Sequence, residues 1–152
     1  LEKLGKLAGL KNFPLHLEVR VDNNGRIMPI EGNPLRYGGW CTSAELTHYA
    51  FGFNPYEYVM EGRQPDWERI LESHSGNRFS IIILNNNSDI DAGDVKSFDY
   101  EKLTGKLEKV LELRKVDAKR FHIFGFVYAE TRPDNFGELK ALLHSNLREF
   151  II

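Results

Sequence analysis

The chain has 152 residues, of which 41% are hydrophobic and 28% charged, with a formal net charge of −2 and a single cysteine. This is the composition of an ordinary globular domain long enough to bury a core, and its charge gives no electrostatic basis for binding nucleic acid or an anionic membrane surface. No apolar run is long enough to span a bilayer, and the lone cysteine excludes an internal disulfide, which favours a cytoplasmic protein.

The first ten residues carry leucines at helical spacing, at positions 1, 4, 7 and 10. This spacing predicts a helix. The chain starts at Leu1 rather than at a methionine, inside this expected helix, so we expect a piece of a longer protein.

Residues 15–33 predict a β-hairpin around Asn24-Gly25. Asn-Gly is the strongest short hairpin signal, because both central residues of the favoured turn need a positive φ. With these two residues as the loop, Glu18 lies directly opposite Glu31. Alternation then predicts an apolar core face with the following members: Leu15, Leu17, Val19, Val21, Met28 and Ile30.

The opposite face of the hairpin holds a possible metal site. Its expected members are Glu18, Arg20, Asp22, Ile27, Pro29, Glu31 and Asn33. Like charges directly opposite each other destabilise a sheet, so a cation between Glu18 and Glu31 is expected. Carboxylate and amide oxygens are the ligands that Mg²⁺ prefers. The alternative is a solvated polar face, which most antiparallel sheets have, and a register shifted by one residue or a bulge would separate the three ligands.

The segment after the hairpin, IEGNPLRYGG at residues 30–39, resembles the C-terminal motif of the ATP-grasp superfamily. There, Glu-x-Asn-Pro-Arg at a strand end precedes a small-residue loop, and another acid stands on the neighbouring strand. The resemblance covers about residues 1–65. It implies that Glu18, Glu31 and Asn33 hold the magnesium ions that bridge the phosphates of ATP.

The same resemblance implies roles for the loop. Arg36 is the candidate catalytic residue, displaced by Leu35 from the usual position, and would steady a substrate carboxylate or an acyl phosphate. Its alternative is a surface arginine. Gly38 and Gly39 are the candidate cofactor-binding residues, since glycine lets a backbone approach an anion closely. A simple turn is the compatible alternative.

A helix is expected next, from a capping box formed by Thr42 and Glu45 to a stop near Gly52. Its N-terminus either completes a substrate site beside the metal or is an ordinary capped end. Cys41 is either a nucleophile, for which no paired histidine is evident, or a packed or loop cysteine.

The second half of the chain predicts alternating helices and strands. In chain order these are a helix at 64–73 capped by Asp66, a strand at 79–84, a polar loop at 85–94, a helical turn at 99–103, strands at about 108–116 and 122–130, and a helix at 136–150 capped by Asp134. The expected inward residues of the last helix are Leu139, Leu142, Leu143 and Leu147.

These elements predict an α+β fold, an antiparallel sheet with helices packed on one face. Residues 1–65 would be the C-terminal half of an ATP-grasp catalytic domain, and residues 66–152 an α+β accessory subdomain packed on the first. The resemblance implies that the phosphate-binding lysines and the adenine-contacting hinge lie in an N-terminal lobe of the same protein. This chain alone would then bind ATP poorly.

The resemblance also implies the activity of the full-length protein. It would be an ATP- and magnesium-dependent ligase that activates a small-molecule carboxylate as an acyl phosphate and passes the acyl group to an amine or another nucleophile. The alternative is a non-catalytic ATP-grasp-derived binding or accessory module.

Overall fold

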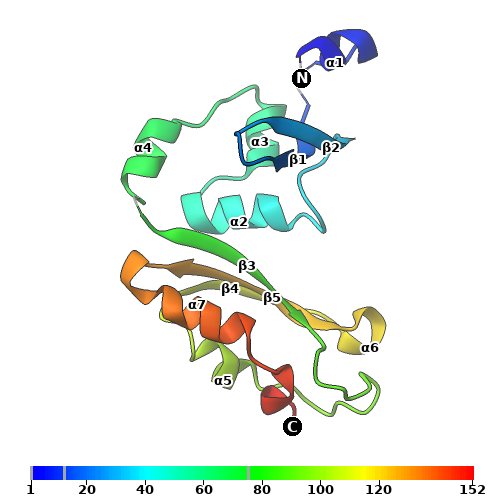
Figure 1. Ribbon diagram of the computed structural model, residues 1–152, viewed down its shortest axis with the longest axis vertical. Helices are drawn as coiled ribbons and strands as arrows, with labels where there is room; N and C mark the ends of the chain where they lie inside the picture. The colour runs from blue at the N-terminus through cyan, green and yellow to red at the C-terminus, as the bar shows by residue number, and fades with distance from the viewer. Residues whose placement is uncertain (1, 12, 75) are drawn as a thin grey trace. The chain divides into compact units, whose positions relative to one another are not determined.

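The computed structural model of the chain describes residues 2–11, 13–74 and 76–152 (Figure 1). The chain divides into two compact units, Leu1–Trp67 and Glu68–Ile152. Both contain helices and antiparallel strands, which confirms the predicted α+β class. The assignment of each part to an ATP-grasp half or an accessory subdomain remains a prediction. Leu1 of the predicted first helix lies outside the described residues. Among those residues, no helix has the length and apolar character needed to cross a membrane.

The first unit contains a two-stranded antiparallel hairpin and short helices. The elements are α1 (Glu2–Ala8), β1 (Leu15–Val21), β2 (Ile27–Pro34), α2 (Thr42–Phe51) and α3 (Pro55–Met60), and α4 (Trp67–Glu72) begins at its last residue. As predicted, α2 ends at Gly52, whose φ of 75° closes the helix. The N-cap of α3 is Asn54, whose side chain accepts a hydrogen bond from Tyr56 N at 3.0 Å.

The tip of the hairpin has a three-residue loop, Asn23–Gly25, instead of the predicted two-residue loop. Asp22 N donates to the carbonyl of Arg26 at 3.1 Å, so these two residues form the last pair. Asp22 Oδ1 accepts from the backbone N–H groups of Asn24 and Arg26, both at 2.9 Å. Gly25 has a φ of 76°, the left-handed position that ends such a loop.

A β-bulge then restores the predicted pairing. Val19 lies opposite Pro29, whereas Glu18 lies opposite Glu31, so Ile30 is the extra residue on β2. The longer loop shifts the register by one residue, and the bulge shifts it back. The bulge lies on the turn side of Glu18 and therefore leaves the predicted ligand face intact.

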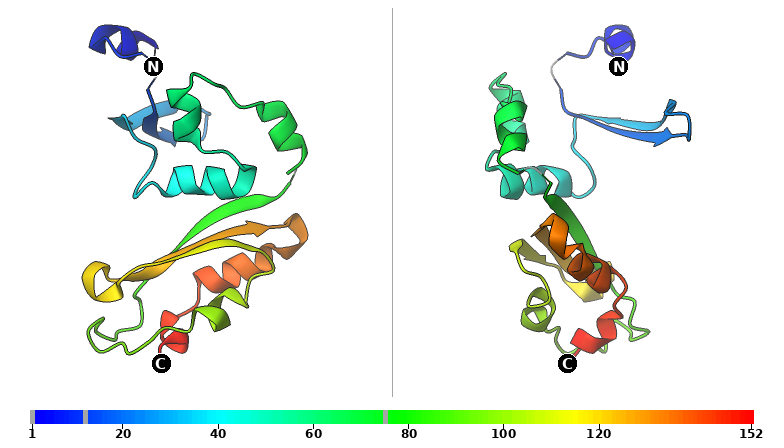
Figure 2. Two further views of the ribbon diagram at one scale, coloured as in Figure 1. Left: turned by 180° about the vertical axis from the view of Figure 1, so that it is seen from behind. Right: turned by 60° about the vertical axis from the view of Figure 1, so that its left-hand side comes forward.

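The predicted core face of the hairpin is wrong near the turn. Met28 lies opposite Arg20, and Ile27 lies opposite Val21, so these two β2 residues exchange faces relative to the prediction. The apolar side chains beyond Glu18 are also exposed: Val19, Val21, Ile27, Met28 and Ile30. Figure 2 shows the hairpin extending away from α2 and α3 within its unit. A two-stranded ribbon has no second layer of its own to bury such a face.

The helices of the first unit pack through aromatic rings. Phe53 contacts both Tyr58 and Trp67, with ring centroids 4.7 and 5.7 Å apart. Trp67 also meets Phe51 edge to face at 5.9 Å. These contacts hold the segment after α3 against the end of α2.

The second unit is a three-stranded antiparallel sheet in the order β3-β5-β4. Its strands are β3 (Arg78–Asn85), β4 (Val110–Lys115) and β5 (Ile123–Thr131), and its helices are α5 (Tyr100–Thr104), α6 (Ala118–Phe121) and α7 (Phe136–Leu143), with 3-10 segments η1 (Pro133–Asn135) and η2 (Leu147–Phe150). The three predicted strands and the helical turn after Asp99 are confirmed. Figure 1 shows α5 and α7 on one face of this sheet. The core cluster there includes Ile82, Leu84, Leu103, Phe124, Val127, Leu142, Leu147 and Phe150.

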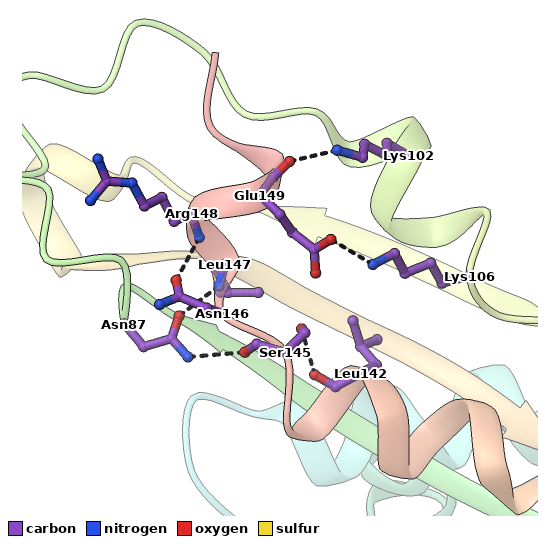
Figure 3. Close-up of polar contacts among 9 residues, drawn as sticks. All are labelled: Asn87, Lys102, Lys106, Leu142, Ser145, Asn146, Leu147, Arg148 and Glu149. Atoms are coloured by element: carbon purple, nitrogen blue, oxygen red, sulfur yellow. Dashed lines mark hydrogen bonds and ion pairs between the residues drawn. The ribbon is translucent and has the colours of Figure 1, made fainter.

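The predicted helix over residues 136–150 is wrong, because the chain leaves α7 after Leu143 and starts η2 at Leu147 (Figure 3). Asn87 Nδ2 donates to the carbonyl of Ser145 at 3.2 Å, and Asn87 Oδ1 accepts from Leu147 N at 2.8 Å. This side chain from a distant loop satisfies backbone groups that a continuous helix would have paired internally. Leu143, which was predicted to face inward, is exposed at the last residue of α7.

The N-terminus of α7 also differs from the prediction. Its N-cap is Asn135, and Asp134 belongs to the preceding η1 turn. Asn135 Nδ2 donates to Glu108 and Glu138, which ties the start of α7 to the loop before β4.

A buried carboxylate in the second unit predicts acid sensitivity. Glu130 in β5 accepts a hydrogen bond from Asn77 Nδ2 at 2.6 Å and forms an ion pair with Lys109. The Lys109 hydrogen bond is the main reason that the pKa of Glu130 lies below its ordinary value; burial opposes this effect. The lowered pKa means that the folded state holds its proton less tightly than the unfolded state.

We therefore expect Glu130 to stabilise the unit above the ordinary glutamate pKa of about 4.3, and this stability to be lost as pH falls through the lower, folded pKa. Glu130→Gln should lower the free energy of unfolding near neutral pH by about 1–3 kcal/mol and reduce its dependence on acid. Urea unfolding across pH 3–7 measures this, with the exposed Glu101→Gln in α5 as control. Equal acid sensitivity in wild type and Glu130→Gln would contradict it.

Candidate functional site

The three predicted metal ligands lie at the end of the hairpin away from its turn. Glu18 on β1 is directly opposite Glu31 on β2, and Asn33 follows two residues after Glu31, on the same face. Asn33 Nδ2 donates to Glu31 Oε1 at 2.8 Å. Because the amide nitrogen is used in this way, the amide oxygen is the atom of Asn33 left to bind a cation.

The electrostatics of this face suit a cation. Both glutamates are exposed, and within the described residues neither forms an ion pair with a lysine or arginine. Opposed carboxylates with an amide oxygen beside them are a donor set that fits Mg²⁺. The set holds two carboxylates only, and no group of three or more His, Cys, Asp or Glu residues that could hold a metal occurs in the described part of the chain. Water and phosphate oxygens would have to complete the coordination.

His16 lies beside this face. It is opposite Asn33 in the register, and its Nδ1 is buried with no hydrogen-bond partner in the described structure. Its ring packs against Gly38, where an added Cβ would approach His16 Nε2 to 3.4 Å and Ser43 Oγ to 2.5 Å. Gly38 is thus required for close packing of the loop on β1 and α2. Gly39 is exposed and has open space around it.

The loop between β2 and α2 is strained at both ends. Leu35 has a φ of 65°, and Trp40 and Cys41 have values of 53° and 61°, all in the left-handed region that disfavours residues with a Cβ. Leu35 N donates to the carbonyl of Pro14 at 2.7 Å, which fixes the first of these turns. Strain of this kind concentrates at functional sites. Arg36, the candidate catalytic residue, is exposed in this loop.

The predicted capping box at the start of α2 is wrong. The N-cap is Cys41, which makes no side-chain cap, and Thr42 is the first helical residue. The hydroxyl of Thr42 donates backwards to the carbonyl of Gly39 at 2.7 Å. Trp40 and Cys41, which precede the helix, both have left-handed backbone angles. The Thr42 hydroxyl closes the loop by bonding to Gly39, so it does not cap the helix.

A cavity of about 440 Å³, which the sequence did not reveal, lies in the first unit. Helix α2 supplies one wall, and the segment after α2, helix α3 and Arg63 supply the rest. The side chains that line it include Cys41, Glu45, His48, Tyr56, Glu57 and Tyr58. The signal in the sequence is the aromatic-rich stretch FGFNPYEY at residues 51–58, which follows the predicted helix stop near Gly52.

The cavity is tied to the loop that follows Asn33. Tyr37 N donates to Tyr56 Oη at 3.1 Å, and the Tyr37 hydroxyl donates to the carbonyl of Pro55 at 3.3 Å. The two rings meet edge to face, 4.7 Å apart. Burial, with Tyr56 adding to the effect, raises the pKa of Tyr37. These hydrogen bonds join the strained loop that follows Asn33 to one wall of the cavity, within a single unit.

Comparison with known proteins supports the resemblance at the N-terminal end. Residues 1–44 match the family model of the ATP-grasp domain, and this range includes all the candidate site residues: Glu18, Glu31, Asn33, Arg36, Gly38 and Gly39. Searches of curated proteins and of solved structures find no match to the chain. The match supports the resemblance seen in the hairpin and its following loop, and it makes residues 1–44 similar to part of an ATP-grasp domain.

Proposed function

We propose that this chain carries the metal-binding end of the active site of an ATP-grasp ligase. The observation that carries the proposal is the position of Glu18 directly opposite Glu31, with Asn33 bonded to Glu31 on the same face. This donor set suits magnesium, which supplies neutralisation of the ATP phosphates when bound. The family match supports ligase chemistry in general terms, and the carboxylate and amine substrates are part of the proposal.

The reaction proposed has two steps. A substrate carboxylate oxygen attacks the γ-phosphorus of ATP, the bond to the β-phosphate oxygen breaks, and ADP leaves with the electron pair. An amine or other nucleophile then attacks the acyl carbon, the carbon–oxygen bond to phosphate breaks with its electron pair on phosphate, and inorganic phosphate leaves with the proton that the nucleophile loses. Glu18, Glu31 and Asn33 hold the cation, and Arg36 pairs with the substrate carboxylate or the acyl phosphate through charge-assisted hydrogen bonds. Gly39, which is exposed with open space around it, lets the loop backbone approach an anion.

A further part of the proposal concerns the other half of the site. An N-terminal ATP-grasp lobe of the same protein covers the apolar side chains of the hairpin in this proposal. Their exposure in this chain supports it. Phosphate-binding lysines and the adenine site belong to that lobe in this proposal. The single cysteine supports the proposal of a cytoplasmic protein.

A second candidate is a non-catalytic module derived from an ATP-grasp domain. The displacement of Arg36 by Leu35, with the left-handed φ of Leu35, favours it, because the arginine is moved away from its usual place in the motif. The ligase would consume ATP with turnover, and the module would not.

The deciding experiment is phosphate release from Mg-ATP by the full-length protein over a panel of carboxylates with and without amines. The ligase proposal expects release that requires magnesium and one carboxylate, with amide formation when an amine is added. Calorimetry of the 152-residue chain with Mg-ATP should show no micromolar binding. Absence of turnover with the whole panel would favour the module, and micromolar binding by this chain alone would contradict the proposed division of the site.

A further inference from the structure

The sheet of the second unit has two edge strands of different character. The order β3-β5-β4 leaves β3 and β4 at its edges. Strand β4 has a bulge and carries Glu112, Arg114 and Lys115, and bulges and charges of this kind keep an edge strand from pairing with another chain. Strand β3 carries the run FSIIIL at residues 79–84, without a charged residue, proline or glycine, and its register with β5 is regular through Ile83. The β3 edge therefore lacks the protection that the β4 edge has.

The outer backbone of β3 is available to a further strand. In an antiparallel sheet, alternate residues direct both their N–H and their C=O groups to one side, so half of these groups in β3 point away from β5. Among the described residues, the backbone groups of residues 80–84 bond only in the ladder to β5. The side chain of Ile83 is 51% exposed. The edge thus offers a row of donors and acceptors next to an exposed apolar side chain.

A cavity of about 230 Å³ lies along the same edge. Residues 82–85 of β3 form one wall, and residues on both sides of the break between α7 and η2 form the other, including Leu142, Leu143 and Leu147. The described lining residues carry no charge, and Leu143 is itself 62% exposed. The lining therefore suits an apolar side chain supplied by a neighbouring chain.

The two ends of the β3 edge carry opposite charges. Arg78 begins the strand and is exposed, with its guanidinium 3.8 Å from the centre of the Phe136 ring. The loop that follows β3 carries three exposed acids, Asp89, Asp91 and Asp94. A second copy that runs antiparallel to the first would bring its acidic loop to Arg78 and its own Arg78 to the acidic loop of the first copy. This charge complementarity favours a second copy of the same chain as the partner.

We propose that two copies of this chain pair antiparallel through β3 and join their three-stranded sheets into one. A two-fold axis perpendicular to the sheet leaves each face on its own side, so only residues that point to the same face lie opposite each other. Pairing centred on Ile82 places Ile81 opposite Ile83 twice. Both copies then present α7 on the same face, and the exposed Leu143 of each copy fills the cavity of the other. This dimer does not rest on the proposed ligase function.

The first test is sedimentation of the full-length protein over a wide concentration range. The wild type should sediment as a dimer at high concentration. Ile83→Lys should raise the dissociation constant of the dimer at least about tenfold, because it adds a charge to each paired edge. Ile152→Lys is the matched control, since it adds the same charge in place of the same residue at a site that is 69% exposed in the same unit, and it should leave the dimer intact. Urea unfolding of both variants reports whether each is folded.

The second test is amide hydrogen exchange of the wild-type full-length protein, which needs no folded variant. Alternate amides of residues 80–84 should exchange more slowly as the concentration rises, and amides of the hairpin β1-β2 should not change. Leu143→Lys, a substitution outside the strand, should weaken the dimer as well, because a lysine does not fit the uncharged cavity.

Three results would overturn the proposal. The first is a protein that stays monomeric at every concentration. The second is a dimer that Ile83→Lys and Leu143→Lys both leave intact, which would place the interface on another surface. The third is protection of residues 80–84 that does not depend on concentration, because another part of the same protein would then cover the β3 edge.

Discussion

Replacing Gly125 by alanine should destabilise the second unit by about 2–4 kcal/mol. Gly125 lies in β5, the central strand of the sheet, opposite Lys115 on β4. A Cβ there would stand 2.5 Å from the carbonyl oxygen of Arg114 and 3.3 Å from the Cα of Lys115. Both are backbone atoms of a paired strand, so neither can move aside without loss of ladder hydrogen bonds. The expected loss is a large fraction of the free energy of unfolding of an ordinary domain.

Gly137→Ala is the matched control, because it adds the same methyl group to the same unit. Gly137 lies in α7, and an added Cβ there meets nothing within 4 Å. Alanine favours a helix over glycine, so this variant should be as stable as wild type or up to about 1 kcal/mol more stable. Urea unfolding of both variants measures the difference. Equal unfolding midpoints for Gly125→Ala and wild type would contradict the strand packing described above.

The second large effect is expected at the candidate metal face. Glu31→Gln and Glu18→Gln should each reduce Mg-ATP-dependent turnover of the full-length protein at least a hundredfold, which corresponds to about 2.7 kcal/mol of lost transition-state stabilisation. The reason is that each change removes one of two carboxylates that would hold the cation. A turnover measurement at saturating Mg-ATP checks this, with Glu72→Gln as the control.

The same variants should affect stability in the opposite direction. Without metal, Glu18 and Glu31 repel each other across the hairpin, so either substitution should raise the free energy of unfolding by about 0.2–1 kcal/mol. Magnesium with ATP should stabilise the wild-type full-length protein and not the variants. Full activity in both variants, or a loss of stability without metal, would contradict the metal assignment.

Local signals in the sequence predicted most of the elements. The alternation of residues 15–21 and 27–33, the glycine at position 52 and the apolar run at 79–84 each specify a strand or a helix end through contacts close in the chain. The pairing of Glu18 with Glu31 was also predicted, although from a two-residue loop. The hairpin has a three-residue loop instead, and the bulge at Ile30 restores the pairing.

Features that depend on distant residues were not predictable. The break between α7 and η2 requires Asn87, which lies far away in the chain and bonds to Ser145 and Leu147. The apolar periodicity of residues 136–150 continues through the break, so the pattern alone predicts one helix. The N-cap at Cys41 likewise depends on the left-handed backbone angles of Trp40 and Cys41, and neither residue type favours that conformation.

The sequence by itself determined the α+β class and the hairpin that carries Glu18, Glu31 and Asn33, because short-range hydrogen bonds and side-chain alternation suffice for these features. The tertiary structure alone decided the bulge at Ile30, which corrects the register after a longer loop and keeps Glu18 opposite Glu31. It also decided the cavity beside α2, because a cavity exists only where side chains from separate helices meet and leave space between them.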